Sequence, residues 1–313
     1  MRLLITGGAG CLGFNLIEEN LAQGNEILVI DNFATGSREA LAASPRLEIV
    51  DGTVADRELV DAVFTRFAPT HVIHSAASYK DPNNWRGDVA TNVTGTINTV
   101  DAARHVGVER FVYLQTALCY GRPERVPIPV DHPTRPFTSY GISKTAGEAY
   151  LAISDLPWVS LRLANITGPR LAIGPIPTFY RRLKSGEKCF CTDTIRDFLD
   201  ISDFLALMKV VLRDDAPTGI FNVSTGEGHT IAEVFDTIAT CLGITLAEAV
   251  PVVPPAADDV PAVVLDASRA REALGWRAEL GLSESIARMV RWYDTHGVPV
   301  IYSHLRPPPA EES

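Results

Sequence analysis

The chain has 313 residues, 46% of them hydrophobic and 21% charged, which is typical of a folded protein with one large or two modest domains. Its formal net charge of −10 argues against broad binding to nucleic acid or to an anionic membrane. An anionic ligand would therefore need a local cluster of donors. No apolar run reaches the ~18 residues of a membrane helix, and the start lacks the regions of a signal peptide, so a cytoplasmic protein is expected.

The five cysteines are scattered and odd in number, which argues against a disulfide framework. Cys189 and Cys191 lack a second ligand pair at the spacing of a zinc site. No metal is expected.

The N-terminal segment has the order of a dinucleotide-binding unit. Leu3–Ile5 is a short apolar run suited to a buried parallel strand, and the glycine-rich segment Thr6–Gly13 follows it. Apolar residues then recur at helical spacing until Gly24, and a second strand, Glu26–Ile30, ends in Asp31. Strand, glycine-rich turn, helix, strand and acid in this order predict a nucleotide site.

Each residue of this pattern has a physical task. Gly7 permits the tight turn, Gly10 lets the backbone approach a pyrophosphate, and Gly13 allows close packing of helix and strand. The helix N-terminus offers free amides to the phosphates. Asp31 would accept hydrogen bonds from ribose hydroxyls and repel a 2′-phosphate, and Asn32, Phe33 and Ala34 supply no cation. NAD is therefore favoured over NADP.

Alternating strands and helices continue through the first half of the chain. Strands are predicted at Leu47–Val50, His71–Ile73 and Phe111–Leu114, with helices over 59–67 and 91–105 between them. This alternation predicts a doubly wound parallel sheet, the Rossmann type of α/β fold. From about residue 166 the alternation stops, which predicts a smaller C-terminal α/β lobe for substrate.

Candidate catalytic residues follow the strand Phe111–Leu114. Thr116 lies at its carboxyl end, where open α/β sheets bind ligands. Tyr140 and Lys144 are four residues apart, so on a helix both can face one site, and a cation beside the phenol favours the phenolate needed for a proton shuttle near pH 7. The alternatives are a packed tyrosine with a solvated lysine, and a threonine that binds only local backbone.

The sequence resembles the extended short-chain dehydrogenase/reductase superfamily, in its nucleotide-sugar epimerase/dehydratase branch. The motifs that carry this resemblance are Thr6–Gly13, Asp31, His74–Ala77, Asn92, Thr116 with Tyr120–Gly121, Tyr140, Lys144, Arg162–Asn165, Gly168–Arg170, Arg196–Phe198 and Leu274–Trp276. More narrowly, Gln115–Gly121 and Leu171–Pro177 resemble epimerases encoded in bacterial O-antigen loci, which build lipopolysaccharide.

The resemblance implies a site and a reaction. Thr116, Tyr140 and Lys144 would be catalytic, with Tyr140 taking the proton of the sugar C4 hydroxyl while its hydride passes to NAD. The 4-keto sugar would then swing about its diphosphate and take the hydride back. The residues implied in cofactor binding are Gly7, Gly10, Cys11, Leu12, Gly13, Asp31, Asn32, Asp51, Gly52, Thr53, Val54, His74, Ala76, Ala77, Asn92, Tyr140 and Lys144. Those implied in substrate binding are Lys80, Thr116, Asn165 and Arg196.

Two positions favour epimerisation over dehydration. Related 4,6-dehydratases and decarboxylases commonly carry acids where Ala117 and Leu118 stand, and neither side chain can move a proton. A dehydratase stays the second hypothesis, with unconventional acid or base groups among Tyr79, Lys80, Asp81 and Cys119. A non-catalytic dinucleotide-binding regulatory protein is the third, and the retained Tyr140 and Lys144 rank it last.

The substrate half departs from the family at two places. Thr53 replaces a usual aspartate, and the stretch 254–258 lacks a diphosphate-binding arginine, for which Arg170, Arg181, Arg182 or Lys80 could compensate. Arg196 could instead pair structurally with Asp197 or Asp200.

The predicted organisation is an NAD-binding domain over 1–165, a substrate lobe over 166–305 with some segments returning to the first domain, and a flexible tail over 306–313. The family commonly forms homodimers through the helices that match 91–105 and 139–153. UDP is its commonest nucleotide carrier.

Overall fold

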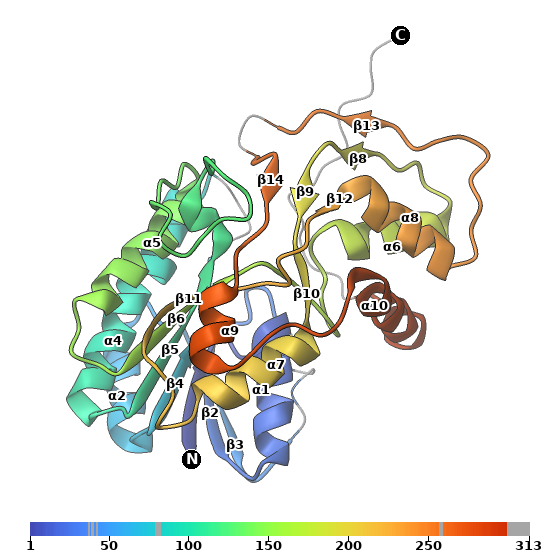
Figure 1. Ribbon diagram of the computed structural model, residues 1–313. Coiled ribbons are helices and arrows are strands. Elements are labelled where there is room, and N and C mark those ends of the chain that lie inside the picture. Colours follow the sequence, from blue (N-terminus) through green and yellow to red (C-terminus); the bar gives the residue numbers. More distant parts are fainter. Residues whose placement is uncertain (37, 39–40, 42, 79–82, 257–258, 299–313) are drawn as a thin grey trace.

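A large parallel sheet, covered by helices on both faces, forms the body of the molecule, and a smaller group of helices and short strands lies beyond its carboxyl edge (Figure 1). The computed structural model describes residues 1–36, 38, 41, 43–78, 83–256 and 259–298. The sheet order is β11-β6-β5-β4-β1-β2-β3, with every neighbouring pair parallel. This arrangement confirms the predicted doubly wound sheet. Its strands are β1 (Arg2–Thr6), β2 (Glu26–Asp31), β3 (Leu47–Asp51), β4 (His71–His74), β5 (Arg110–Thr116), β6 (Trp158–Leu163) and β11 (Gly219–Val223).

Two hydrophobic cores lie on opposite faces of this sheet. One face is covered by α1 (Cys11–Ala22), α7 (Ile201–Val211) and α9 (Ser268–Leu274), and the other by α2 (Arg57–Phe67), α4 (Gly95–Val106) and α5 (Ser139–Ala152). Because both faces are buried, the central strand β1 carries an apolar run: Leu3, Leu4 and Ile5 are all fully buried.

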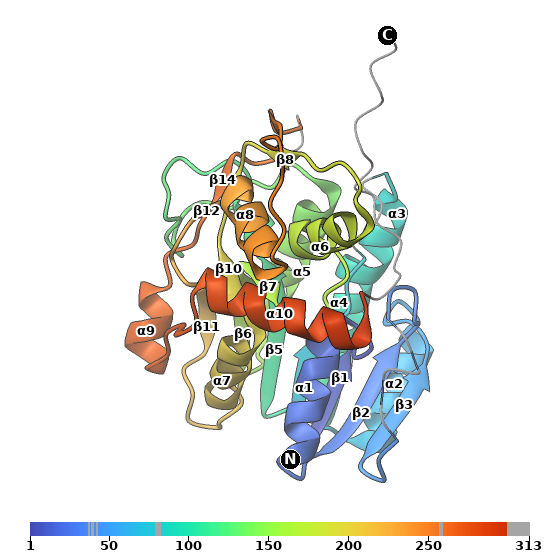
Figure 2. The ribbon, with the colours of Figure 1, turned by 90° about the vertical axis from the view of Figure 1, so that its right-hand side faces the viewer.

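The smaller part has its own core. The helices α6 (Pro175–Ser185), α8 (Ile231–Cys241) and α10 (Leu282–His296) lie close together, as Figure 2 shows from the side, and their buried side chains share one hydrophobic core. Its short strands pair as β10 (Phe198–Asp200) with β7 (Asn165–Thr167), β9 (Ile195–Arg196) with β12 (His229–Thr230) and β14 (Ala262–Val263), and β8 (Cys191–Thr192) with β13 (Val252–Val253).

The second half of the chain also contributes to the large sheet, through β11 and through α7, which packs near α1. The division into 1–165 and 166–305 stays a prediction, and the tail 306–313 lies outside the described residues. None of the helices within the described ranges has the length and apolar character that crossing a membrane requires.

The helix predicted over 91–105 differs in its first turns. A short α3 (Trp85–Asp88) leads into a π-helical segment, η2 (Val89–Thr94), before α4 begins. Within it the Asn92 side chain is fully buried and hydrogen-bonds Ser78 and Ser143, outside its own helix. Such wide turns often mark functional sites. The spacing of apolar residues could not predict this π-helical segment, because the residues that hydrogen-bond Asn92 are distant in sequence.

Candidate active site

An open cavity of about 360 Å³ lies at the carboxyl edge of the large sheet, between the sheet and the smaller part of the molecule. The glycine-rich turn lines it with Gly10–Leu12, and β5 and α5 contribute Thr116 and Tyr140. The opposite wall comes from the segments 163–167 and 170–176. This is the edge at which open α/β sheets bind ligands.

The glycine-rich turn fits a pyrophosphate. Gly7 has φ +69°, and a Cβ on it would lie 2.7 Å from the backbone of Ala76. A Cβ on Gly13 would lie 2.4 Å from the Gly7 carbonyl oxygen, so α1 could not pack as closely with any other residue. Gly10 is the N-cap of α1, no described side chain caps it, and a Cβ there would meet only one atom, at 3.5 Å. Free amides and open space therefore meet at one point.

The carboxylate of Asp31 shapes the neighbouring edge. It accepts hydrogen bonds from the amides of Ala9 (2.8 Å) and Phe33 (2.7 Å), and each oxygen keeps a further lone pair for a ribose hydroxyl. Sequence reasoning overlooked Arg38, whose guanidinium lies over the Phe33 ring and 2.7 Å from Asp51. Because Arg38 pairs with Asp51, its positive charge is partly neutralised, and it is a weaker binding partner for a 2′-phosphate.

The segment after β3 continues this edge. The amide of Gly52 donates to the Asp31 carbonyl, and the Thr53 hydroxyl accepts from the amide of Ala55. Val54 is buried, and its carbonyl accepts a hydrogen bond from Asn98 of α4. These bonds fix the position of the loop, and direct contacts of Asp51–Val54 with a cofactor stay a prediction.

Lys144 is buried in the base of the site, with 1% of its surface exposed. Its ammonium lies 3.9 Å from the centroid of the Tyr113 ring, and burial lowers its pKa to about 7 while Glu148 opposes that shift. The alternative of a solvated lysine is therefore wrong. Tyr140, from the first turn of the same helix, lines the cavity.

Thr116 also lines the cavity, at the end of β5. Its hydroxyl oxygen accepts a hydrogen bond from the amide of Leu118 at 3.2 Å, so the local backbone role does occur. The same hydroxyl still has its own proton to donate, and a catalytic role stays a prediction.

His74 and Asn92 do not line the cavity. Both are buried and hydrogen-bond residues next to it. His74 is fully buried between the hydroxyls of Thr6 (2.8 Å) and Thr96 (3.0 Å), and burial lowers its pKa to about 3, so the imidazole stays neutral. Asn92 binds the backbone of Ser78 and the Ser143 hydroxyl. Their direct contacts with a cofactor stay predictions.

Of the predicted substrate residues, Asn165 lines the cavity and Lys80 lies outside the described residues. Arg196 pairs with Asp259 at 2.5 Å. The suggested partners Asp197 and Asp200 are wrong, because the Asp197 carboxylate accepts from Thr225 and Gly226, and Asp200 caps α7. Arg170 lines the cavity.

A buried ion pair that sequence reasoning missed lies beneath α5. Arg162 and Glu148 are 2.5 Å apart, each 6% exposed at its side chain, and Arg162 also donates to the Tyr120 hydroxyl at 3.0 Å. That hydroxyl donates to Asn222 of β11. The pair therefore joins α5, β6 and β11. Glu148 follows Lys144 by one helical turn, which was the signal available for it.

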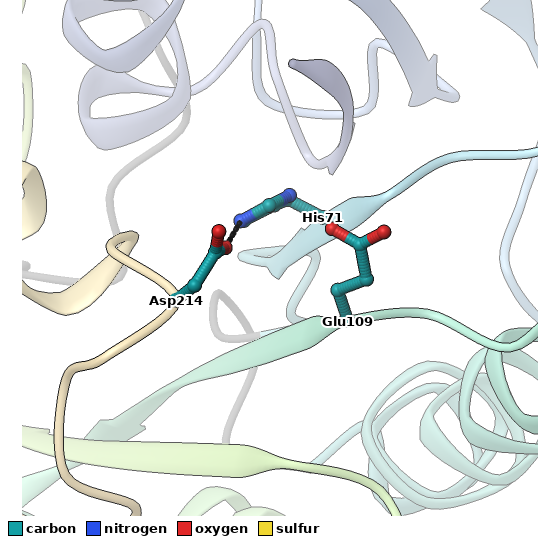
Figure 3. Close-up of side chains that lie close together, drawn as sticks. All are labelled: His71, Glu109 and Asp214. Carbon is teal, nitrogen blue, oxygen red and sulfur yellow. Dashed lines mark ion pairs between the residues drawn. The ribbon is translucent and has the colours of Figure 1, made fainter.

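A second cluster of titratable groups lies at the opposite, amino edge of the sheet (Figure 3). His71, Glu109 and Asp214 bring ligand atoms within 4.8 Å of one another. His71 Nε2, however, lies 3.1 Å from the Leu212 carbonyl oxygen, to which it can only donate, so that nitrogen is not available to a metal. We assign the cluster a structural role.

The fold and the cavity define a dinucleotide-binding α/β protein with a tyrosine and a lysine at its ligand edge. The chain belongs to the NAD dependent epimerase/dehydratase family, whose model matches residues 3–224, and its cofactor is NAD. It is 32% identical to the UDP-glucose 4-epimerase of Mycolicibacterium smegmatis, over 94% of this chain and 98% of that protein.

Solved structures agree with this placement. The Bordetella bronchiseptica enzyme WbmG, in complex with NAD and UDP, is 63% identical, with a TM-score of 0.94 over 98% of this chain and 99% of that one. The UDP-glucose 4-epimerase of Thermus thermophilus, in complex with NAD, is 33% identical, with a TM-score of 0.85 over 95% and 100% of the two chains.

Proposed function

We propose that this protein is a nucleotide-sugar 4-epimerase that acts on a UDP-linked sugar through a transient 4-keto intermediate. The observation that carries this proposal is the cavity itself, where Thr116 and Tyr140 face the space between the glycine-rich turn and the substrate wall. The similarity to UDP-glucose 4-epimerases and to a UDP complex supports it.

The residues would divide the work as follows. NAD, when bound, accepts a hydride from the sugar carbon and returns it. Tyr140 takes the proton of the C4 hydroxyl, and Thr116 shares the hydrogen bond. Lys144 is buried against the Tyr113 ring, and its pKa is lowered to about 7. Ionisation of the Tyr140 phenol, one helical turn earlier, would raise that pKa and favour the charged ammonium. The buried ammonium then stabilises the phenolate that serves as the base.

The chain's own groups would also hold the cofactor. Amides of the first turn of α1 would bind the pyrophosphate, and the Asp31 carboxylate would accept hydrogen bonds from the ribose hydroxyls. Ala77 lines the cavity, and its small side chain would leave room for a flat ring.

Dehydration is the second candidate reaction, and the structure argues against Cys119 as its acid or base group. Ala117 and Leu118 form a 3-10 turn and cannot move a proton. Cys119 is fully buried among apolar side chains, and burial raises its pKa to about 12, so its thiol stays protonated and is poorly suited to act as an acid or a base. Tyr79, Lys80 and Asp81 lie outside the described residues. The non-catalytic regulatory alternative is supported by no observation at the site.

A homodimer through α5 and the η2–α4 helix is part of the proposal. Apolar side chains are exposed along this face: Ile153 is 82% exposed, and Val89, Ile142 and Tyr150 are also exposed. An exposed row of this kind is typical of a protein interface. The proposed setting, synthesis of bacterial O-antigen, rests on the resemblance of 115–121 and 171–177 alone, and a cytoplasmic location stays a prediction.

The reaction is tested by incubating purified protein and NAD with UDP-sugars that include N-acetylated hexosamines and uronic acids, followed by NMR and mass spectrometry. A C4 epimer of equal mass without accumulated NADH is expected. Tyr140→Phe should abolish turnover and leave NAD affinity unchanged. Loss of water from the sugar would support the dehydratase, and an unchanged rate in Tyr140→Phe would contradict the role of the base.

A further inference from the structure

Arg170 is the one charged side chain among the described residues that line the cavity. The cavity also receives the starts of two helices, with Gly10–Leu12 from α1 and Gly174–Ile176 from α6. Each helix has glycine as its N-cap and no described side chain that caps it. Helix N-termini carry partial positive charge. Arg170 therefore adds a full positive charge to a cavity already lined by two such termini.

The backbone of Arg170 is held in an unusual conformation. Its φ is +69°, in the left-handed region that residues with a Cβ rarely adopt. The preceding residue is fixed on α1, because the Pro169 carbonyl accepts hydrogen bonds from Cys11 Sγ (3.4 Å) and Asn15 Nδ2 (3.2 Å). Such conformations cluster at functional sites, where the surrounding structure maintains them.

The guanidinium itself lies over the ring of Phe14, 3.3 Å from its centroid, beside the first turn of α1. Within the described ranges it forms no ion pair and no hydrogen bond, unlike Arg162 and Arg196, which form both, although the charge of exposed Glu18 acts on it from farther away. Burial lowers its pKa, although an arginine stays charged in a protein. A half-buried cation with no carboxylate in direct contact is costly unless an anion completes the site.

We propose that the guanidinium of Arg170 binds the diphosphate of a nucleotide held in this cavity. This inference rests on the proposed function, which requires two such diphosphates, one in NAD and one in the nucleotide sugar. The planar guanidinium can give two parallel hydrogen bonds to phosphate oxygens, in addition to its charge. The residue thus supplies a cation in a substrate lobe where Asp259 already neutralises Arg196.

The test compares Arg170→Asn, Arg170→Lys and a matched control, Arg182→Gln. Asparagine tolerates a positive φ, so Arg170→Asn removes the charge without adding backbone strain. Arg182 lies near the end of α6, over the Phe190 ring, and does not line the cavity. Calorimetry measures the affinities for NAD and for UDP, and thermal melting checks the fold.

Arg170→Asn should weaken the binding of at least one nucleotide about tenfold or more, with its melting temperature not lowered. Arg170→Lys should recover part of that loss, and Arg182→Gln should bind as the wild type does. A loss confined to NAD assigns the guanidinium to the cofactor, and a loss confined to UDP assigns it to the substrate. Unchanged affinities for both would overturn this inference alone. Wild-type protein that bound neither nucleotide would instead contradict the proposed function.

Discussion

The side-chain amide of Gln115 donates a hydrogen bond of 3.0 Å to the backbone carbonyl oxygen of Lys144. Its own carbonyl oxygen accepts the amide of Thr116 at 2.8 Å, and the side chain is only 2% exposed. The Tyr113 hydroxyl donates to the same Lys144 oxygen, also at 3.0 Å. One buried side chain therefore connects the end of β5 with α5, and fixes Thr116 relative to the lysine.

Replacing Gln115 should impair turnover more than binding. Gln115→Leu keeps the volume but deprives the half-buried Thr116 amide of the Gln115 acceptor, which costs about 1 kcal/mol. We expect kcat to fall about tenfold or more with KM little changed. Tyr113→Phe is the matched control, because it removes one bond to Lys144 and none to Thr116, and it should lower kcat less. Equal kcat values for Gln115→Leu and wild type would show that this bridge does not position the site.

Lys144 should make stability depend on pH. Its pKa is lowered from 10.5 to about 7 in the folded state, so between these values the unfolded chain binds a proton that the folded chain lacks. Stability therefore rises with pH across this window, by about 1.4 kcal/mol for each pH unit that separates the two pKa values. Below pH 7 the penalty for burying the ammonium is fully present.

Lys144→Met should remove this dependence. Urea denaturation of nucleotide-free protein between pH 6 and pH 10 measures it, as the difference in unfolding free energy between wild type and variant. We expect the variant to be more stable by a few kcal/mol at pH 6, with the difference shrinking toward pH 10. A difference that stays constant with pH would contradict the lowered pKa.

The buried pair of Glu148 and Arg162 should show strong coupling. Removing either partner leaves the other charge buried, so Glu148→Leu or Arg162→Met alone should cost about 3 kcal/mol or more of unfolding free energy. The double variant leaves neither charge and should lose less than the sum of the two single losses. Chemical denaturation of all four proteins gives the coupling. Strict additivity would mean that the pair contributes only as two separate side chains.

The exposed apolar face of α5 should control association. Ile153→Glu places a charge where 82% of the isoleucine surface is exposed in the single chain. In sedimentation velocity, wild type should run as a dimer and the variant should shift toward monomer, without a lower melting temperature. Exposed Tyr150→Glu tests the same face a turn earlier. A monomeric wild type would contradict the homodimer.

Local patterns were sufficient for the sheet and the glycine-rich turn. Leu3–Ile5 falls inside β1, and the roles expected for Gly7 and Gly13 match the backbone that each contacts. These features depend on residues close in sequence, whose spacing and size fix the conformation.

Features that depend on tertiary partners could not be predicted in this way. Arg196 pairs with Asp259, 63 residues away, and not with a neighbouring acid. The bridge from Gln115 to Lys144 spans 29 residues, and the π-helical turn at Asn92 depends on bonds to Ser78 and Ser143. No periodicity in the sequence encodes which of several polar residues will meet.

The central claim is that one carbon of the sugar is oxidised and then reduced again by the same hydride. The most direct test supplies a UDP-sugar deuterated at C4, with NAD, in ordinary water and follows the products by NMR and mass spectrometry. The account predicts a C4 epimer of unchanged mass that keeps its deuterium at C4, formed more slowly than from the undeuterated sugar. An epimer that has lost the deuterium to solvent, or a product lighter by one water, would contradict it.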